Sequence, residues 1–354
     1  MRALIIGDWP PPYGGISVHV VGLRALLRAE GWETRVLDVA RPRKPEPPAP
    51  DVVPIRGAMH LAREILAEVS RGAVVHVHIC GHHRRSWTLA GAAVWLARAW
   101  NAAVLVTVHS GLAPAYLGPA RRRLLVRAAC GPADRVLCAN EEILRSLRRC
   151  DLRPGRLEVL PAFLAVGRGV SAPPLAVASL AGRCDPILAV SLGDGPEYGG
   201  DLLLAALDLV AVRFPRLGLF ALGSGSRGPW EAKARERVGD RLVALGELPH
   251  RDALGVLAAS TVFVRPTLTD GDSVSVREAL SLGVPVAATG VAPRPAGAHV
   301  AVAEPGPLAE AVVEAVGEGR RGPVPAGSAD ARLVEIYRAL GRRGPAWLPE
   351  KRTA

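Results

Sequence analysis

The sequence of 354 residues contains little cysteine, and the cysteines it has form no recognisable framework. The set is odd, and no two members stand in C-x-x-C spacing; they are Cys80, Cys130, Cys138, Cys150 and Cys184. An odd set without this spacing argues against a disulfide scaffold and against a zinc ribbon. We therefore interpret the five cysteines as small hydrophobic residues of a folded core.

Long hydrophobic runs are also missing. The opening MRALIIG is too short for the apolar part of a secretion signal, and it leads into Asp8 and three prolines. The longest apolar region, 89–108, is interrupted by Arg98 and Asn101, which indicates a helix followed by a strand and not a membrane span. These absences predict a cytoplasmic protein.

Aromatic residues make up only 4% of the chain, and no nucleic-acid-binding motif accompanies its positive charge. Nucleic acid is therefore not an expected partner. The net charge of +11 is uneven: residues 1–165 hold 23 basic and 13 acidic side chains, whereas the rest of the chain holds 21 and 20. The excess positive charge thus lies in the first half of the chain, where it indicates one basic face or one binding partner.

The composition and the length agree with a globular chain of two domains. Hydrophobic residues make up 49% and charged residues 22%, which excludes wholesale disorder. Short apolar runs such as 3–6, 74–77 and 104–108 alternate with segments of helical period such as 16–30 and 87–100. Near-continuous apolar strands separated by helices are typical of a parallel sheet covered on both faces.

The same alternation restarts after Pro186, so we predict an α/β fold of two doubly wound, Rossmann-like parallel-sheet domains facing each other across a cleft. The first domain is expected over 1–165 and the second over 186–328, with a linker over 166–185. We expect the C-terminal helical segment, 329–354, to pack back on the first domain. The proline-rich stretch 41–54 is predicted to be a surface loop.

Ligands of parallel α/β sheets bind beyond the carboxyl ends of the strands, so the loops that follow the strands are informative. After the first strand, Gly14 and Gly15 open a helix, where backbone N–H groups and the helix dipole favour an anion. A tight turn without a ligand is the alternative. The loop is not G-x-G-x-x-G, and no acidic residue is expected to close the second strand as in nicotinamide enzymes, which disfavours a dehydrogenase.

In the second half, a polar turn follows the strand at 262–264 and leads into a helix. Residues 271–275 place successive N–H groups at that helix N-terminus, a pattern that favours an anion. Asp270 precedes the helix and Glu278 lies about one turn inside it, and carboxylates suit the recognition of sugar hydroxyls. The alternative is a simple helix cap at Ser273 with a solvated Glu278.

Histidines gather in the first half. His109 ends a predicted strand, which suits an active site, although a structural histidine is equally compatible with the pattern. His76, His78 and Cys80 alternate along another strand, but one segment rarely supplies a whole tetrahedral site, so we expect no metal site. For the following loop we favour a contact of His82, His83 and Arg84 with a substrate that the first domain binds, or with an anionic group on it.

A basic helix face is formed by Arg121, Arg122, Arg123 and Arg127. It is either an ordinary solvated face or a surface attracted to anionic lipid, to which each basic residue contributes about 1 kcal/mol. The second interpretation predicts peripheral contact with an anionic membrane, at the inner face of the cell membrane.

Taken in order, the motifs resemble those of the family 4 glycosyltransferases, which are retaining enzymes of the GT-B fold. The matching stretches are PPYGGISVHV, VTVHSG, ADRVLCANEE, VLPAF, GDGPEYGGDLLL, ALGSGS, LGELPHRD and PTLTDGDSVSVREALSLGVPVAAT. The resemblance implies transfer of a sugar from a nucleotide-sugar donor to a glycan or lipid-linked acceptor, in polysaccharide or glycolipid biosynthesis. It implies no cofactor and no required metal ion, with the donor bound by the second domain and the acceptor by the first.

The resemblance also assigns roles to individual residues. Glu278 should hold the donor ribose, Asp270 should contact the donor sugar where the family usually has Glu, and His109 should lie near that sugar. Together these three form the expected catalytic set. The expected donor-binding set is Gly14, Gly15, Gly193, Arg265, Gly271, Asp272, Ser273 and Val274.

One departure from the family pattern concerns charge. The family usually carries an Arg and a Lys that neutralise the leaving diphosphate, where this chain has Leu192 and Tyr198. Losing two cations beside a developing pyrophosphate is costly. We expect another cation to substitute, with Arg265, Arg277 and Arg227 as candidates. The alternatives are a different mode of donor binding, a non-catalytic nucleotide-sugar-binding partner protein, and a related epimerase or phosphorylase.

Overall fold

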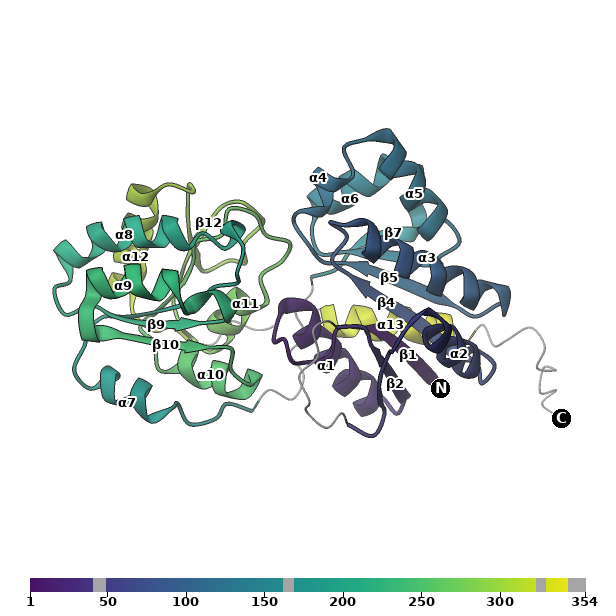
Figure 1. The fold of residues 1–354 in the computed structure, drawn as a ribbon, viewed down its shortest axis with the longest axis horizontal. Coiled ribbons are helices and arrows are strands. Elements are labelled where there is room, and N and C mark those ends of the chain that lie inside the picture. The colour runs from purple at the N-terminus through teal and green to yellow at the C-terminus, as the bar shows by residue number, and fades with distance from the viewer. Residues whose placement is uncertain (41–48, 162–168, 323–328, 343–354) are drawn as a thin grey trace. The chain divides into compact units, whose positions relative to one another are not determined.

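The computed structural model describes residues 1–40, 49–161, 169–322 and 329–342, and it divides into two compact units (Figure 1). The first unit comprises residues 1–167 and 327–354, and the second comprises residues 168–326. The domain boundaries predicted near 165 and 328, and residues 343–354 of the predicted C-terminal helical segment, lie outside the described residues.

The first unit contains a parallel sheet of seven strands in the order β3-β2-β1-β4-β5-β6-β7. The strands are β1 (Arg2–Gly7), β2 (Glu33–Asp38), β3 (Val52–Pro54), β4 (Ala73–Ile79), β5 (Val104–Val108), β6 (Arg135–Cys138) and β7 (Leu157–Val159). Successive side chains of a strand point to opposite faces, so Leu4 and Ile6 join one hydrophobic core and Ile5 joins the other. Both faces are therefore apolar and both are covered.

Helices cover the two faces of this sheet (Figure 1). One face carries α2 (Ala58–Val69), α3 (Arg84–Ala99), α4 (Ala113–Tyr116), α5 (Ala120–Cys130) and α6 (Glu141–Arg148). The other face carries α1 (Gly15–Ala29) and α13 (Ala329–Gly341). Short 3-10 turns occur in both units, at Pro154–Arg156, Pro196–Tyr198, Ser224–Ser226 and Gly239–Arg241.

Helix α13 packs on the first unit although it follows the whole second unit in the sequence. Its fully buried Tyr337 contacts the Trp32 ring edge to face, with centroids 5.3 Å apart. The Tyr337 hydroxyl lies 2.9 Å from Nδ1 of His76 on β4. Hydrophobic burial and a buried polar contact thus both hold α13 in place.

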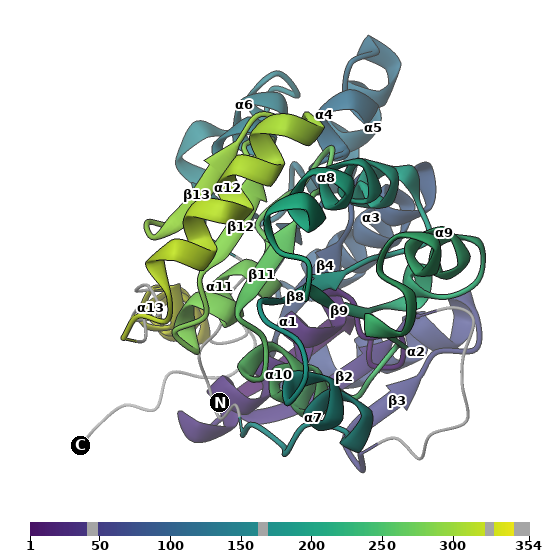
Figure 2. The ribbon, with the colours of Figure 1, turned by 90° about the vertical axis from the view of Figure 1, so that its left-hand side faces the viewer.

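The second unit contains a parallel sheet of six strands in the order β10-β9-β8-β11-β12-β13. The strands are β8 (Ile187–Ser191), β9 (Gly218–Leu222), β10 (Leu242–Gly246), β11 (Val262–Arg265), β12 (Val286–Thr289) and β13 (Ala298–Ala301). One face is covered by α8 (Gly200–Arg213), α9 (Pro229–Val238) and α12 (Pro305–Glu318), as Figure 2 shows. The other face is covered by α7 (Leu175–Ala181), α10 (His250–Ala258) and α11 (Val274–Ser281).

Two parallel sheets, each covered by helices on both faces, confirm the predicted fold class. Two segments differ from the prediction. Val52–Pro54 form the edge strand β3 inside the stretch predicted as a loop, because Val36–Asp38 offer it a free parallel edge. Part of the stretch predicted as a linker is helix α7, whose Val177 and Leu180 are buried in the core of the second unit.

None of the helices in the described ranges has both the length and the apolar character that a bilayer crossing requires.

Candidate functional site

Each sheet has one point where the strand order reverses, between β1 and β4 in the first unit and between β8 and β11 in the second. Loops on either side of such a point diverge and leave room for a ligand beyond the carboxyl ends of the strands. In the second unit the loops at this point run over 192–199 and 266–273. In the first unit they run over 8–14 and 80–83. Most of the residues singled out in the sequence lie in or next to these loops.

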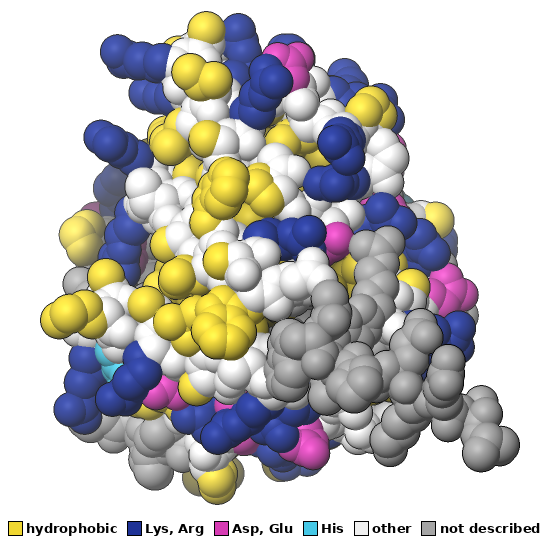
Figure 3. Space-filling model, turned by 90° about the vertical axis from the view of Figure 1, so that its right-hand side faces the viewer, with side chains coloured by type: hydrophobic (Ala, Val, Ile, Leu, Met, Phe, Trp, Pro, Cys, Tyr) yellow, Lys and Arg dark blue, Asp and Glu magenta, His cyan; other side chains and the backbone are white. Residues whose placement is uncertain are grey.

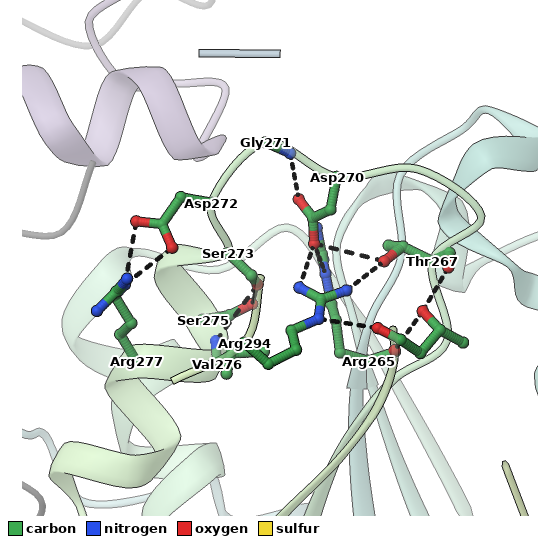
Figure 4. Close-up of polar contacts among 11 residues, drawn as sticks. Arg265, Thr267, Asp270, Gly271, Asp272, Ser273, Ser275, Val276, Arg277 and Arg294 are labelled. Atoms are coloured by element: carbon green, nitrogen blue, oxygen red, sulfur yellow. Dashed lines mark hydrogen bonds and ion pairs between the residues drawn. The ribbon is translucent and has the colours of Figure 1, made fainter. Parts of the chain in front are cut away.

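Asp270 is the centre of a charged cluster in the second unit (Figure 4). Its carboxylate accepts hydrogen bonds from Nε of Arg265 at 3.1 Å and from Nη1 of Arg294 at 2.9 Å. The Arg294 side chain is only 1% exposed, and its other nitrogens donate to the Thr289 carbonyl and the Thr267 hydroxyl. Arg294 was not predicted from the sequence, because it stands in a proline- and glycine-rich loop 24 residues beyond Asp270.

The protonation state of Asp270 follows from two opposing effects. Burial raises the pKa of its carboxyl, but the guanidinium groups of Arg265 and Arg294 outweigh burial and lower the pKa to about 2. Asp270 is therefore ionised at neutral pH. The cluster of Arg265, Arg294 and Asp270 therefore carries one excess positive charge, and the acidic side chains of Asp194 and Glu197 act on the same Tyr198 ring as Arg265.

The two positions that lack the expected cations have different surroundings. Leu192 is 3% exposed and belongs to the core of the second unit. The Tyr198 ring covers Gly193 so closely that a Cβ on this glycine would clash with the ring. The guanidinium of Arg265 lies over the same ring, 5.7 Å from its centroid. Arg265 thus brings positive charge next to the position where a lysine was expected.

The other two candidate cations are placed less favourably. Nε of Arg277 lies 2.8 Å from Asp272, whose side chain is 4% exposed, so this pair neutralises itself (Figure 4). Arg227 has a half-exposed side chain and lies 3.9 Å from Glu231. Nη1 of Arg265 makes no hydrogen bond within the described part of the chain, so Arg265 retains a donor for an anion.

Helix α11 begins at the loop that carries Gly271 and Asp272. Its N-cap is Ser273, whose side chain accepts a hydrogen bond from the N–H of Val276 at 3.4 Å. The N–H groups of Val274 and Ser275 come before the first helical carbonyl that could accept them, so they are available for an anion at the positive end of the helix dipole. The cap and an anion-binding role are therefore compatible.

Glu278 lies one turn inside α11 and is buried, with 5% of its surface exposed. Its Oε1 is 2.7 Å from Nε2 of His250, the first residue of α10. His250 was part of the LGELPHRD motif but was not predicted as a site residue. The contact shows that Glu278 is held by its surroundings and is not the solvated surface residue of the alternative interpretation.

In the first unit, Gly14 and Gly15 cap and open helix α1. A Cβ on either glycine would meet no heavy atom within 4 Å, so the space above this turn is open. The prediction that no acidic residue closes the second strand is wrong, because β2 ends at Asp38. The Asp38 carboxylate accepts hydrogen bonds from the N–H groups of Trp9 and Ala40 and thereby holds the loop after β1.

His109 follows β5 and is 8% exposed. Its Nε2 lies 3.1 Å from Nδ1 of His78, and His19 of α1 packs against both rings. Burial, followed by repulsion from neighbouring imidazoles, holds the pKa of His78 and of His109 well below the usual range. Both side chains are therefore neutral at pH 7. His19 was not predicted, since it stands on a helix whose pattern shows only hydrophobic burial.

The loop after β4 carries the residues predicted for the acceptor side. His82 is half-buried, with Nδ1 3.1 Å from the Ser110 hydroxyl. His83 caps helix α3, because its Nδ1 accepts a hydrogen bond from the N–H of Ser86, and its Nε2 lies 3.3 Å from the Cys80 sulfur. Arg84 is exposed at the start of α3. The loop therefore presents two imidazoles and positive charge.

The predicted basic face of α5 is partly engaged in local contacts. Arg122 and Arg123 donate to the carbonyls of Tyr116 and Gly118, and Arg127 pairs with Asp151. Large hydrophobic side chains are also exposed on α5 and on α3: Leu124 (66%) on α5, and Trp95 (58%), whose indole N–H donates to the Ala128 carbonyl of α5. Figure 3 shows a face of the first unit where hydrophobic side chains lie exposed among Lys and Arg.

Comparisons with known proteins agree with this architecture. Residues 13–166 match the family model described as Glycosyltransferase Family 4, and residues 187–318 match the one described as Glycosyl transferases group 1. A curated relative is one of the subunits of phosphatidylinositol N-acetylglucosaminyltransferase from Arabidopsis thaliana. It is 24% identical over 314 residues, which cover 82% of this chain and 68% of the relative.

Solved structures show the same fold. Sucrose-phosphate synthase from Thermosynechococcus elongatus superposes with a TM-score of 0.67 at 18% identity, covering 97% of this chain and all of that chain. Anabaena HepE, solved in complex with UDP and glucose, superposes with a TM-score of 0.68 at 12% identity. The superposition covers 96% of this chain and 100% of that chain. The fold is therefore that of the GT-B proteins. With both halves matched by their family models, the chain belongs to the glycosyltransferases of family 4 and group 1.

Proposed function

We propose that this protein is a retaining glycosyltransferase that moves a sugar from a nucleotide-sugar donor to a hydroxyl group of a glycan or lipid-linked acceptor. The second unit binds the donor, and the first unit binds the acceptor. The reaction belongs to the assembly of a polysaccharide or a glycolipid. The Arabidopsis relative is named as a subunit of phosphatidylinositol N-acetylglucosaminyltransferase, which supports a lipid-linked acceptor. The HepE structure contains UDP and glucose, which supports a nucleotide-sugar donor.

The observation that carries the proposal is the convergence of Arg265 and Arg294 on Asp270 at the carboxyl end of β11. A diphosphate next to the N-terminus of α11 would meet the helix dipole, the N–H groups of its first turn and the spare donor of Arg265. This positive charge compensates for the cations missing at Leu192 and Tyr198. The site thus stabilises a leaving diphosphate by electrostatics, which is commonly a large contribution to catalysis.

In the proposed reaction, the bond between the donor C1 and the phosphate oxygen breaks, and the acceptor oxygen bonds to C1 on the same face. The acceptor proton passes to the departing phosphate oxygen. Glu278 accepts hydrogen bonds from the donor ribose, and Asp270 from the donor sugar. His109 stands near the sugar as a neutral imidazole. Positioning and leaving-group charge then account for the rate, with no metal ion in the reaction.

A donor panel tests the proposal. The purified protein is mixed with UDP-, GDP-, TDP- and ADP-sugars, and nucleotide release is followed with and without membrane lipid. Release from one donor that depends on lipid supports a transferase. Tight binding of a donor without release in the presence of any acceptor supports a non-catalytic binding protein, and conversion of a donor without an acceptor supports an epimerase. If the protein neither binds a donor nor releases its nucleotide, the result contradicts the donor site.

Glu278→Gln should lower kcat/KM for the donor by about 10- to 100-fold, because the amide loses charge-assisted hydrogen bonds worth about 1.5–3 kcal/mol. The substitution keeps the shape of the side chain, so the unfolding midpoint should change little. His109→Ala should lower kcat as well. Steady-state kinetics with the donor found in the panel provide the measurement, and wild-type rates in either variant would show that the assigned residue has no role.

We further propose that the face formed by α3 and α5 contacts an anionic membrane at the inner face of the cell membrane. Basic side chains at 121–123 and 127 share α5 with exposed Leu124, and exposed Trp95 donates from its indole N–H to the Ala128 carbonyl of the same helix. Tryptophan prefers the membrane–water interface, and arginine is attracted to anionic headgroups.

Binding to sedimented vesicles of mixed anionic and zwitterionic lipid tests this contact. Replacing Arg121, Arg123 and Arg127 with glutamine should weaken binding by about 100-fold, at about 1 kcal/mol for each residue, with little effect on purely zwitterionic vesicles. Replacing three exposed arginines of the second unit, Arg213, Arg216 and Arg235, is the matched control. Equal losses in both triple variants would indicate that net charge, and not this face, determines binding.

A further inference from the structure

We propose that His19, His78 and His109 form a binding site for one divalent transition-metal ion, of which Zn²⁺ is the expected occupant. The three residues come from different segments: the first turns of α1, strand β4 and the position directly after β5. One ligand nitrogen from each lies within 4.8 Å of the other two. The sequence pattern draws attention only to histidines along a single segment, whereas this cluster is formed by the fold.

The spacing of the rings fits a metal site. Their centroids are 5.1 Å apart for His19 and His78, 5.1 Å for His19 and His109, and 5.4 Å for His78 and His109. Three imidazoles that bind one tetrahedral ion through Zn–N bonds of about 2.05 Å have centroids about 5.2 Å apart and nitrogens about 3.3 Å apart. The observed separation between Nδ1 of His78 and Nε2 of His109 is 3.1 Å. The triangle therefore has the required size before any ion is bound.

The hydrogen bonding of His78 separates this residue from its neighbour His76. Nδ1 of His78 is the nitrogen that faces His109, and its Nε2 is buried without a hydrogen-bond partner among the described residues, which is costly for a polar atom. The neighbouring His76 differs, because Tyr337 and Thr107 engage both of its nitrogens. Both nitrogens of His76 are thus engaged by structural partners, whereas the hydrogen bond of His78 that an ion would displace is to another histidine of the cluster.

A second cluster, Cys80, His82 and His83, has ligand atoms equally close together. Its hydrogen bonds oppose metal binding. Nδ1 of His83 accepts a hydrogen bond from the Ser86 N–H, so the proton of the neutral ring resides on Nε2, the nitrogen that faces the Cys80 sulfur. An ion at that nitrogen would have to displace this proton and break the cap of α3. The three-histidine cluster is the better site, because the hydrogen bond that an ion would displace there joins two of the ligands themselves and caps no helix.

Three imidazoles leave a fourth position of a tetrahedral ion open to water or to a substrate oxygen. Among divalent ions, nitrogen ligands favour Zn²⁺, Cu²⁺, Ni²⁺ and Co²⁺ over Mg²⁺ and Ca²⁺. One consequence rests on the proposed function. An ion bound to His109 would take this residue from the donor sugar, so Zn²⁺ should inhibit a reaction that itself needs no metal.

Cobalt absorption and zinc calorimetry on the full chain, freed of metal with a chelator, test the site. We expect one ion per chain, with the intense visible bands of tetrahedral Co²⁺ and without the near-ultraviolet band that a cysteine thiolate produces. His19→Ala and His78→Ala should each weaken Zn²⁺ binding by more than about 100-fold, since losing even an outer partner of a ligand costs about 10- to 100-fold. Cys80→Ser and His83→Ala should leave binding unchanged.

Several results would overturn the site: no binding by the wild-type chain, a thiolate band, loss of binding in Cys80→Ser, or full binding in both histidine variants. The three histidines are buried, so circular dichroism is recorded for every variant. His19→Gln and His78→Gln, which keep a polar side chain of similar bulk, replace any alanine variant that fails to fold. Binding is measured without a sugar donor, so a failure of the proposed function would leave this test intact.

Discussion

Replacing Arg265 with alanine should lower kcat by about 100-fold, because loss of one preorganised donor to a developing charge commonly costs 10²- to 10³-fold. Arg265 lies over Tyr198, where the family usually carries a lysine, and it keeps one nitrogen free of hydrogen bonds within the described ranges. Asp270 retains Arg294 in the variant, so the loop should keep its conformation. Single-turnover rates with the active donor provide the measurement.

Three further variants make the result specific. Arg265→Lys should lower kcat by about 10-fold, because lysine keeps the charge but not the planar fork of donors. Arg277→Ala and Arg227→Ala remove the other two candidate cations, of which one is paired with Asp272 and the other is half-exposed. Each of these two variants should lower kcat by less than about 3-fold, a smaller loss than in Arg265→Ala. A larger loss of kcat in Arg227→Ala than in Arg265→Ala would show that Arg227, and not Arg265, supplies the compensating charge.

Asp270→Asn should destabilise the protein by about 3–5 kcal/mol, because it leaves buried guanidinium groups without their counter-charge. The Arg294 side chain is 1% exposed and cannot turn to solvent without disrupting its bonds to Thr267 and Thr289. Urea unfolding should show a lower midpoint with an unchanged slope. The matched control is Asp201→Asn, which breaks an exposed pair with Lys233 and should cost about 1 kcal/mol or less.

The same carboxylate makes this loss dependent on pH. The folded-state pKa of Asp270 is about 2, below its ordinary value of 3.8, so ionised Asp270 stabilises the folded state above about pH 4. This contribution disappears as the pH falls through the folded-state value. The difference in unfolding free energy between the wild type and Asp270→Asn should therefore be constant from pH 5 to 7 and shrink between about pH 4 and 2. A constant difference down to pH 2 would show that charge is not its cause.

Much of the fold could be predicted because buried strands and amphipathic helices leave regular patterns. Ala3–Ile6 and Val104–Val108 were predicted as strands, and β1 and β5 occupy these positions. Short edge strands leave weaker patterns: Val52–Pro54 has only three residues, and Ala298–Ala301 contains a histidine in place of a continuous apolar run. Pairing with a neighbouring strand, which the local sequence does not encode, makes these segments strands.

For the candidate site, the sequence was informative about positions and uninformative about partners. The turn at 270–275 and the histidine after β5 could be found because they follow strands. Arg294 and His250 could not, since each reaches its carboxylate across the tertiary structure from another element. The same is true of the three-histidine cluster, in which His19 and His109 are 90 residues apart. Convergence of this kind depends on the topology of the sheet.

Helix α13 has a consequence for the synthesis of the chain. Domains generally fold in the order in which the ribosome releases them, but one core of the first unit includes Leu333, Tyr337 and Leu340, which leave the ribosome after the entire second unit. Until then, the face of this core that α13 covers, next to Trp32 and β4, is exposed. The unit that is made first is thus completed last, and in the nascent protein this exposed face is a natural binding site for chaperones.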